Sequence, residues 1–239
     1  MTEMQLHPRR TSELFDATVT VVRARFGSMV MASLIVAVPY ALSSIPGLDL
    51  LVLLAALLTP IAFGATIFLA AGAYVGVAPD WQRALSYAWK EYLPLLIASV
   101  VAAIAIMAGL PFLIFPGIFL AISFALALES VMLEGRGGFS SLGRSWRLVN
   151  EHRGRIFWAG LIFFLVIGLA IGISYGIVWG LSNQTVADIW AGITNLVTIP
   201  LTSAFGVAFY FDLRVRKENL DVDADQINEI RMRLGAGPA

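Results

Sequence analysis

The stretch from Pro116 to Trp158 decides the fold, because it joins three segments of different character. It opens with PGIFLAISFALALESVMLE (residues 116–134), an apolar run close to the roughly 20 residues that cross a bilayer. The middle part, GRGGFSSLGRSWRLVNEHRGR (residues 135–155), is basic and amphipathic, and a second apolar run begins at IFW (residues 156–158). We therefore expect a membrane helix, a surface helix and another membrane helix, an arrangement that the remainder of the chain repeats.

The composition points to lipid as the main solvent of the protein. Of the 239 residues, 59% are hydrophobic and 13% are charged, whereas soluble domains are about 45–50% apolar and about 25% charged. The formal net charge is zero, which gives no reason to expect a nucleic-acid partner. The absence of cysteine excludes disulfides and thiolate metal sites. We expect no cleavable signal peptide in the polar first 25 residues.

The apolar segments predict an all-α, polytopic membrane protein that forms a single membrane domain over residues 1–239. Turns with proline or glycine and three amphipathic segments separate these apolar segments. The predicted spans are residues 27–45, 50–78, 93–110, 117–133, 156–181 and 200–213. The amphipathic segments, at residues 12–26, 79–92 and 134–155, are predicted to lie on the membrane surface.

The order of these segments indicates an internal repeat. The predicted units are residues 12–78, 79–134 and 135–216, followed by a charged tail at 217–239. Each unit would hold a surface helix, a span, an outer turn and a returning span. Pro60, Pro116 and Pro200 occupy comparable places in the units and are predicted to kink their helices, because proline removes a backbone hydrogen bond. A plain series of hairpins joined by amphipathic loops is the alternative interpretation.

The distribution of basic residues predicts the orientation. All 16 Lys and Arg residues fall in the segments 1–26, 79–92, 134–155 and 212–239, and the opposite side carries only Asp49 and Asp188. The positive-inside rule places the basic side, and with it both termini, in the cytoplasm. Anionic lipids of the cytoplasmic leaflet are then expected to attract the three surface helices.

Two carboxylates in the apolar segments are candidate functional residues, because ionisable groups within a bilayer usually have a role. Glu129 lies within an apolar run, and Asp212 occupies a similar depth near the cytoplasmic face. A structural role is the favoured interpretation, in which the two carboxylates pair with nearby arginines and fix surface helices to spans. The predicted charge network comprises Glu129, Glu134, Arg144, Arg147, Asp212 and Arg214.

Four glycines lie on one stripe of the predicted fifth span, where small residues let helices approach closely. They are Gly160, Gly168, Gly172 and Gly176. Packing inside the protein is the favoured interpretation, and a dimer face is the alternative. The sequence lacks the motifs of common hydrolases, metalloenzymes and nucleotide-binding proteins. We therefore expect no catalytic, metal or cofactor-binding residues and no enzyme activity.

Three short segments resemble a known bacterial family. They are RSWRL (144–148) after a Glu-Gly break, YFDLRVRKENLD (210–221) and ELFDAT (13–18). These segments resemble the family named for the membrane domain of glycerophosphoryl diester phosphodiesterase, together with related six-span proteins. The resemblance implies a multi-pass protein of the bacterial inner membrane. In fused members the phosphodiesterase chemistry belongs to a separate soluble domain, so the resemblance brings no catalytic residues.

Two classes of function remain open from the sequence. The first is a non-catalytic membrane module that acts as a scaffold, partner subunit or envelope-maintenance protein, with a membrane-protein partner or a second copy of the chain. The second is a transporter or lipid-handling carrier for a neutral or amphipathic molecule. A water-accessible cavity with convergent polar groups would favour the carrier, and a filled core with an exposed groove of small residues would favour the partner subunit.

Overall fold

The computed structural model describes residues 7–111, 115–182, 184–221 and 223–235. Within these residues the fold is all-helical, and six helical segments are long and apolar enough to cross a membrane. The all-α, multi-pass architecture predicted from the sequence is thereby confirmed. Residue 222 and residues 236–239 of the predicted tail lie outside the described part of the chain.

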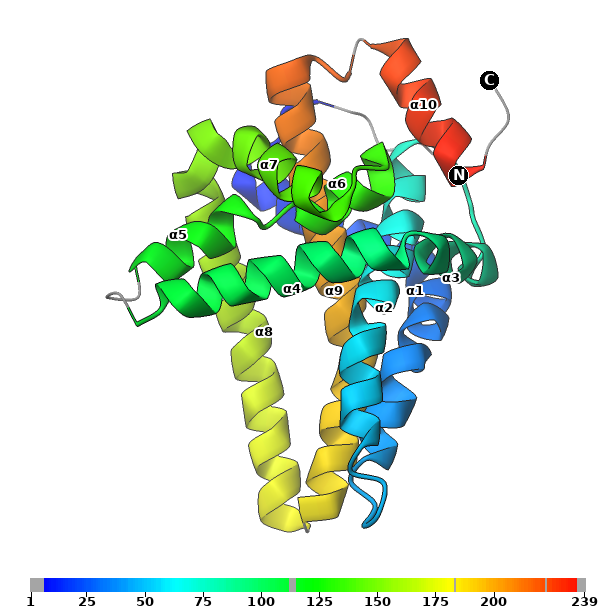
Figure 1. Ribbon diagram of the computed structural model, residues 1–239, viewed down its shortest axis with the longest axis vertical. Helices are drawn as coiled ribbons and strands as arrows, with labels where there is room; N and C mark the ends of the chain where they lie inside the picture. Colours follow the sequence, from blue (N-terminus) through cyan, green and yellow to red (C-terminus); the bar gives the residue numbers. More distant parts are fainter. Residues whose placement is uncertain (1–6, 112–114, 183, 222, 236–239) are drawn as a thin grey trace.

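Four long helices run along the long axis of the molecule (Figure 1). They are α1 (Thr11–Leu42), α2 (Leu51–Tyr74), α8 (Arg153–Leu181) and α9 (Gln184–Glu218). At 1.5 Å per residue, the 32 residues of α1 extend about 48 Å, well beyond the roughly 30 Å of a bilayer's hydrocarbon core. Helix α1 is therefore longer than a span alone requires.

The shorter polar helices gather at one end of the long helices (Figure 1). They are α3 (Trp81–Lys90), α7 (Gly138–Val149) and α10 (Ala224–Leu234), and a short 3₁₀ turn at Asn150–His152 joins α7 to α8. The aspartates Asp80 and Asp223 cap α3 and α10 by accepting from backbone amides three residues later. This end of the molecule, which also holds the ion pairs around Glu134 and Asp212, is called the polar cap.

The predicted surface helix at residues 12–26 is not a separate element. It continues without a break into the first span as α1, since a lone glycine at residue 27 costs a helix only about 1 kcal/mol. The buried face of α1 is also continuous across that point, from Leu14 and Val21 to Met29 and Ala32. Packing along this face outweighs the local glycine.

The predicted start of the last span at residue 200 is also wrong, because α9 begins at Gln184 and runs through Pro200 to Glu218 as one helix. Pro60 likewise lies inside α2. Each proline removes one backbone hydrogen bond, but tertiary packing holds both helices together. At Gly192, for example, α9 lies so close to α1 that a β-carbon would come within 2.9 Å of Ala41 Cβ. Pro116 is in the first turn of α5, where proline is tolerated.

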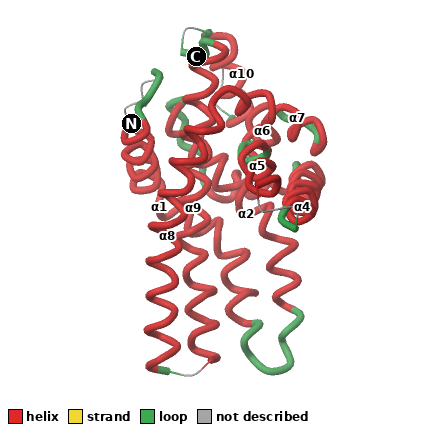
Figure 2. The backbone as a smooth tube through the Cα atoms, turned by 90° about the vertical axis from the view of Figure 1, so that its left-hand side faces the viewer, coloured by secondary structure: helices red, strands yellow, loops and turns green. Residues whose placement is uncertain are grey.

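The third and fourth apolar segments run across the long helices. Figure 1 shows α4 (Tyr92–Gly109) and α5 (Phe115–Ser123) lying crosswise near the polar cap, and Figure 2 shows α4 nearly end-on. Leu95 of α4 is fully buried beside Gly64 of α2, where a β-carbon would come within 2.8 Å of Leu95 Cδ1. The hairpin thus differs in direction from the α1–α2 and α8–α9 hairpins, and the internal repeat stays a prediction.

The segment predicted as one span over residues 117–133 is broken in two. Helix α5 ends at Ser123, a turn occupies residues 124–126, and α6 (Ala127–Glu134) follows. Ser145 of α7 fills the break: its hydroxyl donates to the Ser123 carbonyl at 2.8 Å and accepts from the Leu126 amide at 3.0 Å. Irregular backbone in an apolar segment needs such partners, because lipid supplies none.

Candidate ligand cavity and polar cap

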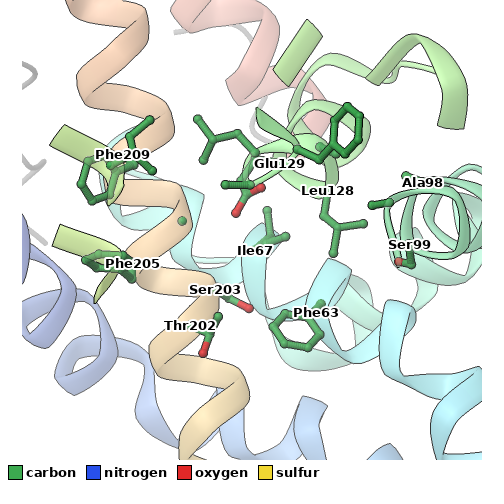
Figure 3. A pocket seen from close by; sticks show the side chains of 18 of the residues that line it. Phe63, Ile67, Ala98, Ser99, Leu128, Glu129, Thr202, Ser203, Phe205 and Phe209 are labelled. Carbon is green, nitrogen blue, oxygen red and sulfur yellow. The ribbon is translucent and has the colours of Figure 1, made fainter. Parts of the chain in front are cut away.

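A cavity of about 250 Å³ lies where the crosswise helices meet the long ones (Figure 3). Its wall is formed by α2, α4, the α5–α6 break, the first turn of α6, α8 and α9, and most of the lining side chains are apolar. The volume is just below the range of about 300–1,000 Å³ that is typical of ligand sites. The cavity therefore has room for a small ligand.

Glu129 is the one ionisable residue among the described residues that line this cavity. It lies in the first turn of α6, directly after the break, and is only 5% exposed. Its carboxyl group points into the interior between α6 and α9 (Figure 3). The positive end of the α6 dipole favours a negative charge at this place, while the apolar wall makes an unpaired charge costly.

Gly206 of α9 makes room for the Glu129 side chain. A β-carbon built at residue 206 would overlap Oε1 of Glu129 and come within 3.1 Å of its Cδ. Any other residue at this position would push the carboxyl group away or separate α9 from α6. The pair Glu129 and Gly206 therefore fixes where the carboxylate oxygens lie in the cavity.

Three hydroxyl side chains complete the polar part of the wall: Ser99, Thr202 and Ser203. Ser99 Oγ donates to the Leu95 carbonyl at 2.8 Å, within its own helix. Ser203 Oγ lies 2.6 Å from Thr66 Oγ1, and Thr66 itself bonds to the Ala62 carbonyl at 2.8 Å. Because Thr66 has only one hydroxyl proton, Ser203 is the donor in this pair when Thr66 donates to the Ala62 carbonyl.

The polar cap contains one ion-pair cluster around Glu134 at the end of α6. The Glu134 carboxylate accepts from Arg136 Nε at 2.6 Å and from Arg144 Nε at 2.8 Å. Arg144 also forms a two-pronged ion pair with Glu218, and Arg214 bonds to the same Glu218 at 2.8 Å. These contacts join the ends of α6 and α9 to the middle of α7.

A second cluster surrounds Asp212, whose side chain is fully buried. Asp212 accepts from Arg155 Nη1 at 2.7 Å, from Arg216 Nε at 3.1 Å and from the backbone amide of Arg9 at 2.7 Å. The Arg9 guanidinium in turn donates to the Tyr74 hydroxyl at 3.1 Å. The cluster attaches the segment before α1 to the beginning of α8 and the end of α9.

The expected pairing of Glu129 and Asp212 with Arg144, Arg147 or Arg214 is corrected by these contacts. Among the described residues, Glu129 makes no ion pair with these three arginines and lies apart from both clusters. The side chain of Arg147 is exposed, and the residue contributes its carbonyl, which accepts from Lys217 Nζ at 3.0 Å. The partners of Asp212 are instead Arg216, one turn later on the same helix, and Arg155 at the beginning of α8.

The glycine stripe on α8 faces outward. A β-carbon at Gly160, Gly168, Gly172 or Gly176 would meet nothing within 4 Å, so the stripe does not pack against the rest of the described chain. Gly160 differs from the others because it lines the cavity. Internal packing, the favoured interpretation from the sequence, is therefore wrong for this stripe.

Sequence reasoning missed the partners that define the cavity, namely Gly206, Ser203 and Ser145. Gly206 and Ser203 are ordinary small residues of an apolar helix, and Ser145 belongs to RSWRL, a segment that indicates a family resemblance but no role for the serine. A weak signal exists in the register of α9, since Ser203 and Gly206 are three residues apart and therefore share a face. Nothing in the sequence shows that this face meets Glu129.

Comparison with known families gives a match over residues 98–213, just under half of the chain, to a domain of unknown function (DUF7847). The matched range contains the α5–α6 break, Glu129, Gly160 and Gly206, and it contains all lining residues of the cavity except Phe63 and Ile67 of α2. No curated protein and no solved structure matches the chain. The part of the molecule that forms most of the cavity is thus similar to a domain whose function is unknown.

Proposed function

We propose that this chain is a non-catalytic, multi-pass membrane protein that holds a small amphipathic molecule in the cavity beside Glu129. The observation that supports this function most strongly is a buried carboxyl group in an apolar cavity with no arginine or lysine among its described lining residues. Apolar walls with a few placed polar groups are typical of small-molecule sites. A purely structural carboxylate would be expected to pair with a cation, as Glu134 and Asp212 do.

The break between α5 and α6 supports the same function. Broken helices beside a cavity recur in membrane transporters, where helix ends and unpaired backbone groups contact the ligand. Here the residues of the break, 124–126, line the cavity, and Glu129 follows one turn later. This general similarity is an analogy, and it favours a carrier over a scaffold with a filled core.

We further propose that the protein lies in the bacterial inner membrane with the polar cap and both termini in the cytoplasm. The positive-inside rule and the resemblance to the phosphodiesterase membrane-domain family are the support for this location. The basic residues of the cap would then contact anionic headgroups, at about 1 kcal/mol for each Lys or Arg near the surface.

Native mass spectrometry of the protein in an uncharged maltoside detergent tests ligand binding. Gly160→Leu places a side chain in the cavity, while Gly168→Leu makes the same change on the outward face of the same helix. We expect the wild type and Gly168→Leu to retain a bound small molecule or lipid that Gly160→Leu loses. Equal retention in both variants, or an empty wild type, would contradict the proposed function.

A partner-subunit function is the second candidate, and the outward glycine stripe favours it. Three glycines of α8 are exposed, and many of the side chains around them on this helix are large, apolar and exposed as well. The three are Gly168, Gly172 and Gly176. A close-packing helix of another membrane protein or of a second copy would cover this stripe. A pull-down from native membranes tests the partner: Gly172→Leu should remove a stoichiometric partner that Gly143→Leu, on the exposed face of α7, retains.

A further inference from the structure

We infer that the ligand of the cavity is a small organic cation, such as an amine or quaternary ammonium compound with an apolar body. This inference rests on the proposed function and adds the charge of the ligand to it. Three features of the cavity wall support it: an acidic group with no cationic residue beside it, two of three hydroxyls engaged in hydrogen bonds within the protein, and several phenylalanine rings.

The first feature is the isolation of the carboxyl group. Glu129 is the one residue of the described cavity wall that can carry a charge, and the cavity lining includes no Lys, Arg or His. A buried carboxylate is costly unless an opposite charge or hydrogen-bond donors accompany it. The notch at Gly206 holds Oε1 in place before any ligand arrives. A cation that enters the cavity would supply the missing counter-charge.

The second feature is the shortage of hydrogen-bond donors. Ser99 donates to the Leu95 carbonyl, and Ser203 donates to Thr66 when Thr66 gives its own proton to the Ala62 carbonyl. These two hydroxyls then present only lone pairs to the cavity. Thr202 is the one other hydroxyl among the described lining residues. With the Glu129 oxygens, the wall offers mainly acceptors. An acidic ligand would face repulsion there, whereas a ligand with N–H donors or a positive charge matches the wall.

The third feature is a set of aromatic rings. Five phenylalanines line the cavity together with Glu129: Phe63, Phe124, Phe164, Phe205 and Phe209. Phe205 and Phe209 come from successive turns of α9 and meet edge to face, with ring centroids 5.0 Å apart (Figure 3). The faces of such rings attract cations, and rings beside a carboxylate are suited to alkylammonium groups that carry no N–H. The apolar faces would contact the body of the ligand.

The test compares benzyltrimethylammonium with neopentylbenzene, its uncharged isostere. Binding to the full chain in maltoside detergent is measured by isothermal titration and by the shift of the melting temperature. We expect the wild type to prefer the cation by about tenfold or more, and we expect Glu129→Gln to reduce this preference to less than about threefold. Gly160→Leu should weaken both probes, and Gly168→Leu should weaken neither. Size-exclusion chromatography shows whether each variant is folded.

Other outcomes separate this inference from the proposed function. The cation inference is overturned if the two probes bind with equal affinity, or if the preference for the cation survives in Glu129→Gln. The proposed function stands in either case if native mass spectrometry still shows a ligand that Gly160→Leu loses. If Glu129→Gln does not fold, the wild type and Gly160→Leu still test the inference. A preference of the wild type for the cation that is lost in Gly160→Leu supports it, and equal affinity of the wild type for both probes overturns it. The mass of the native ligand distinguishes an amine-bearing lipid from a small soluble amine.

Discussion

The hydroxyl of Ser145 donates a hydrogen bond to the carbonyl of Ser123 at 2.8 Å and thereby satisfies a backbone acceptor at the end of α5. The same oxygen accepts from the Leu126 amide at 3.0 Å. One buried side chain thus satisfies backbone groups on both sides of the α5–α6 break. Since the break directs Glu129 into the cavity, Ser145 connects the packing of α7 to the geometry of the candidate site.

Replacing Ser145 with Ala should destabilise the protein by about 1–3 kcal/mol, because two backbone groups lose their partner in a buried place. Thermal unfolding in detergent measures the loss. Ser140→Ala is the matched control, since Ser140 is on the same helix but exposed, and it bonds only to the nearby Gly137 carbonyl. A Ser145→Ala variant as stable as Ser140→Ala would show that the break does not depend on this side chain.

Double-mutant cycles should separate the two clusters of the polar cap. Asp212→Asn leaves Arg155 and Arg216 without a buried carboxylate and should cost about 3–5 kcal/mol of unfolding free energy. Asp212→Asn and Arg155→Gln should be non-additive, because the residues are in contact. Asp212→Asn and Arg144→Gln should be additive, because Arg144 pairs with Glu134 and Glu218 instead. Coupling in the second cycle and additivity in the first would contradict the observed pairing.

The sequence allowed a sound prediction of the helices and a poor one of their contacts. Apolar length alone identifies the six segments, because lipid requires each spanning backbone to satisfy its own hydrogen bonds. The bounds at Pro200 and at residues 26–27 were wrong, since local helix breakers compete with tertiary packing that the sequence does not display. The direction of α4 depends on contacts such as Leu95 with Gly64, which lie far apart in the chain.

The candidate site shows the same division. Glu129 was identified from the sequence, because a carboxylate in an apolar run is unusual. Its surroundings were not predictable, because they depend on which faces of α2, α4, α8 and α9 converge. The break at residues 124–126 contains neither proline nor glycine, so these residues themselves do not predict a break in the helix. It is stabilised by Ser145, about twenty residues later in the chain.

Single-cysteine labelling should reveal the course of the α4–α5 hairpin, and the chain offers a cysteine-free background. Ser44→Cys and Ser182→Cys lie at the end of the long helices opposite the polar cap and should react with a membrane-impermeant maleimide from outside the cell. Because the hairpin lies crosswise near the cap, Phe115→Cys should stay unlabelled from that side. If Phe115→Cys were labelled to the same extent as Ser44→Cys, α4 and α5 would instead cross the whole bilayer, as the sequence predicts.

Gly206→Ala tests the close contact between α9 and Glu129. A methyl group at this position would overlap the Glu129 carboxyl, and relief of such a clash costs about 1–3 kcal/mol in a packed interior. In the Glu129→Ala background the clash is gone, so the same substitution should cost little, or stabilise through the better helix propensity of alanine. Gly143→Ala, on an exposed face of α7 with nothing within 4 Å, is the control for propensity alone. An equal cost of Gly206→Ala in both backgrounds would mean that the carboxyl group does not occupy the notch at residue 206, and the fixed position of Glu129 in the cavity would then be wrong.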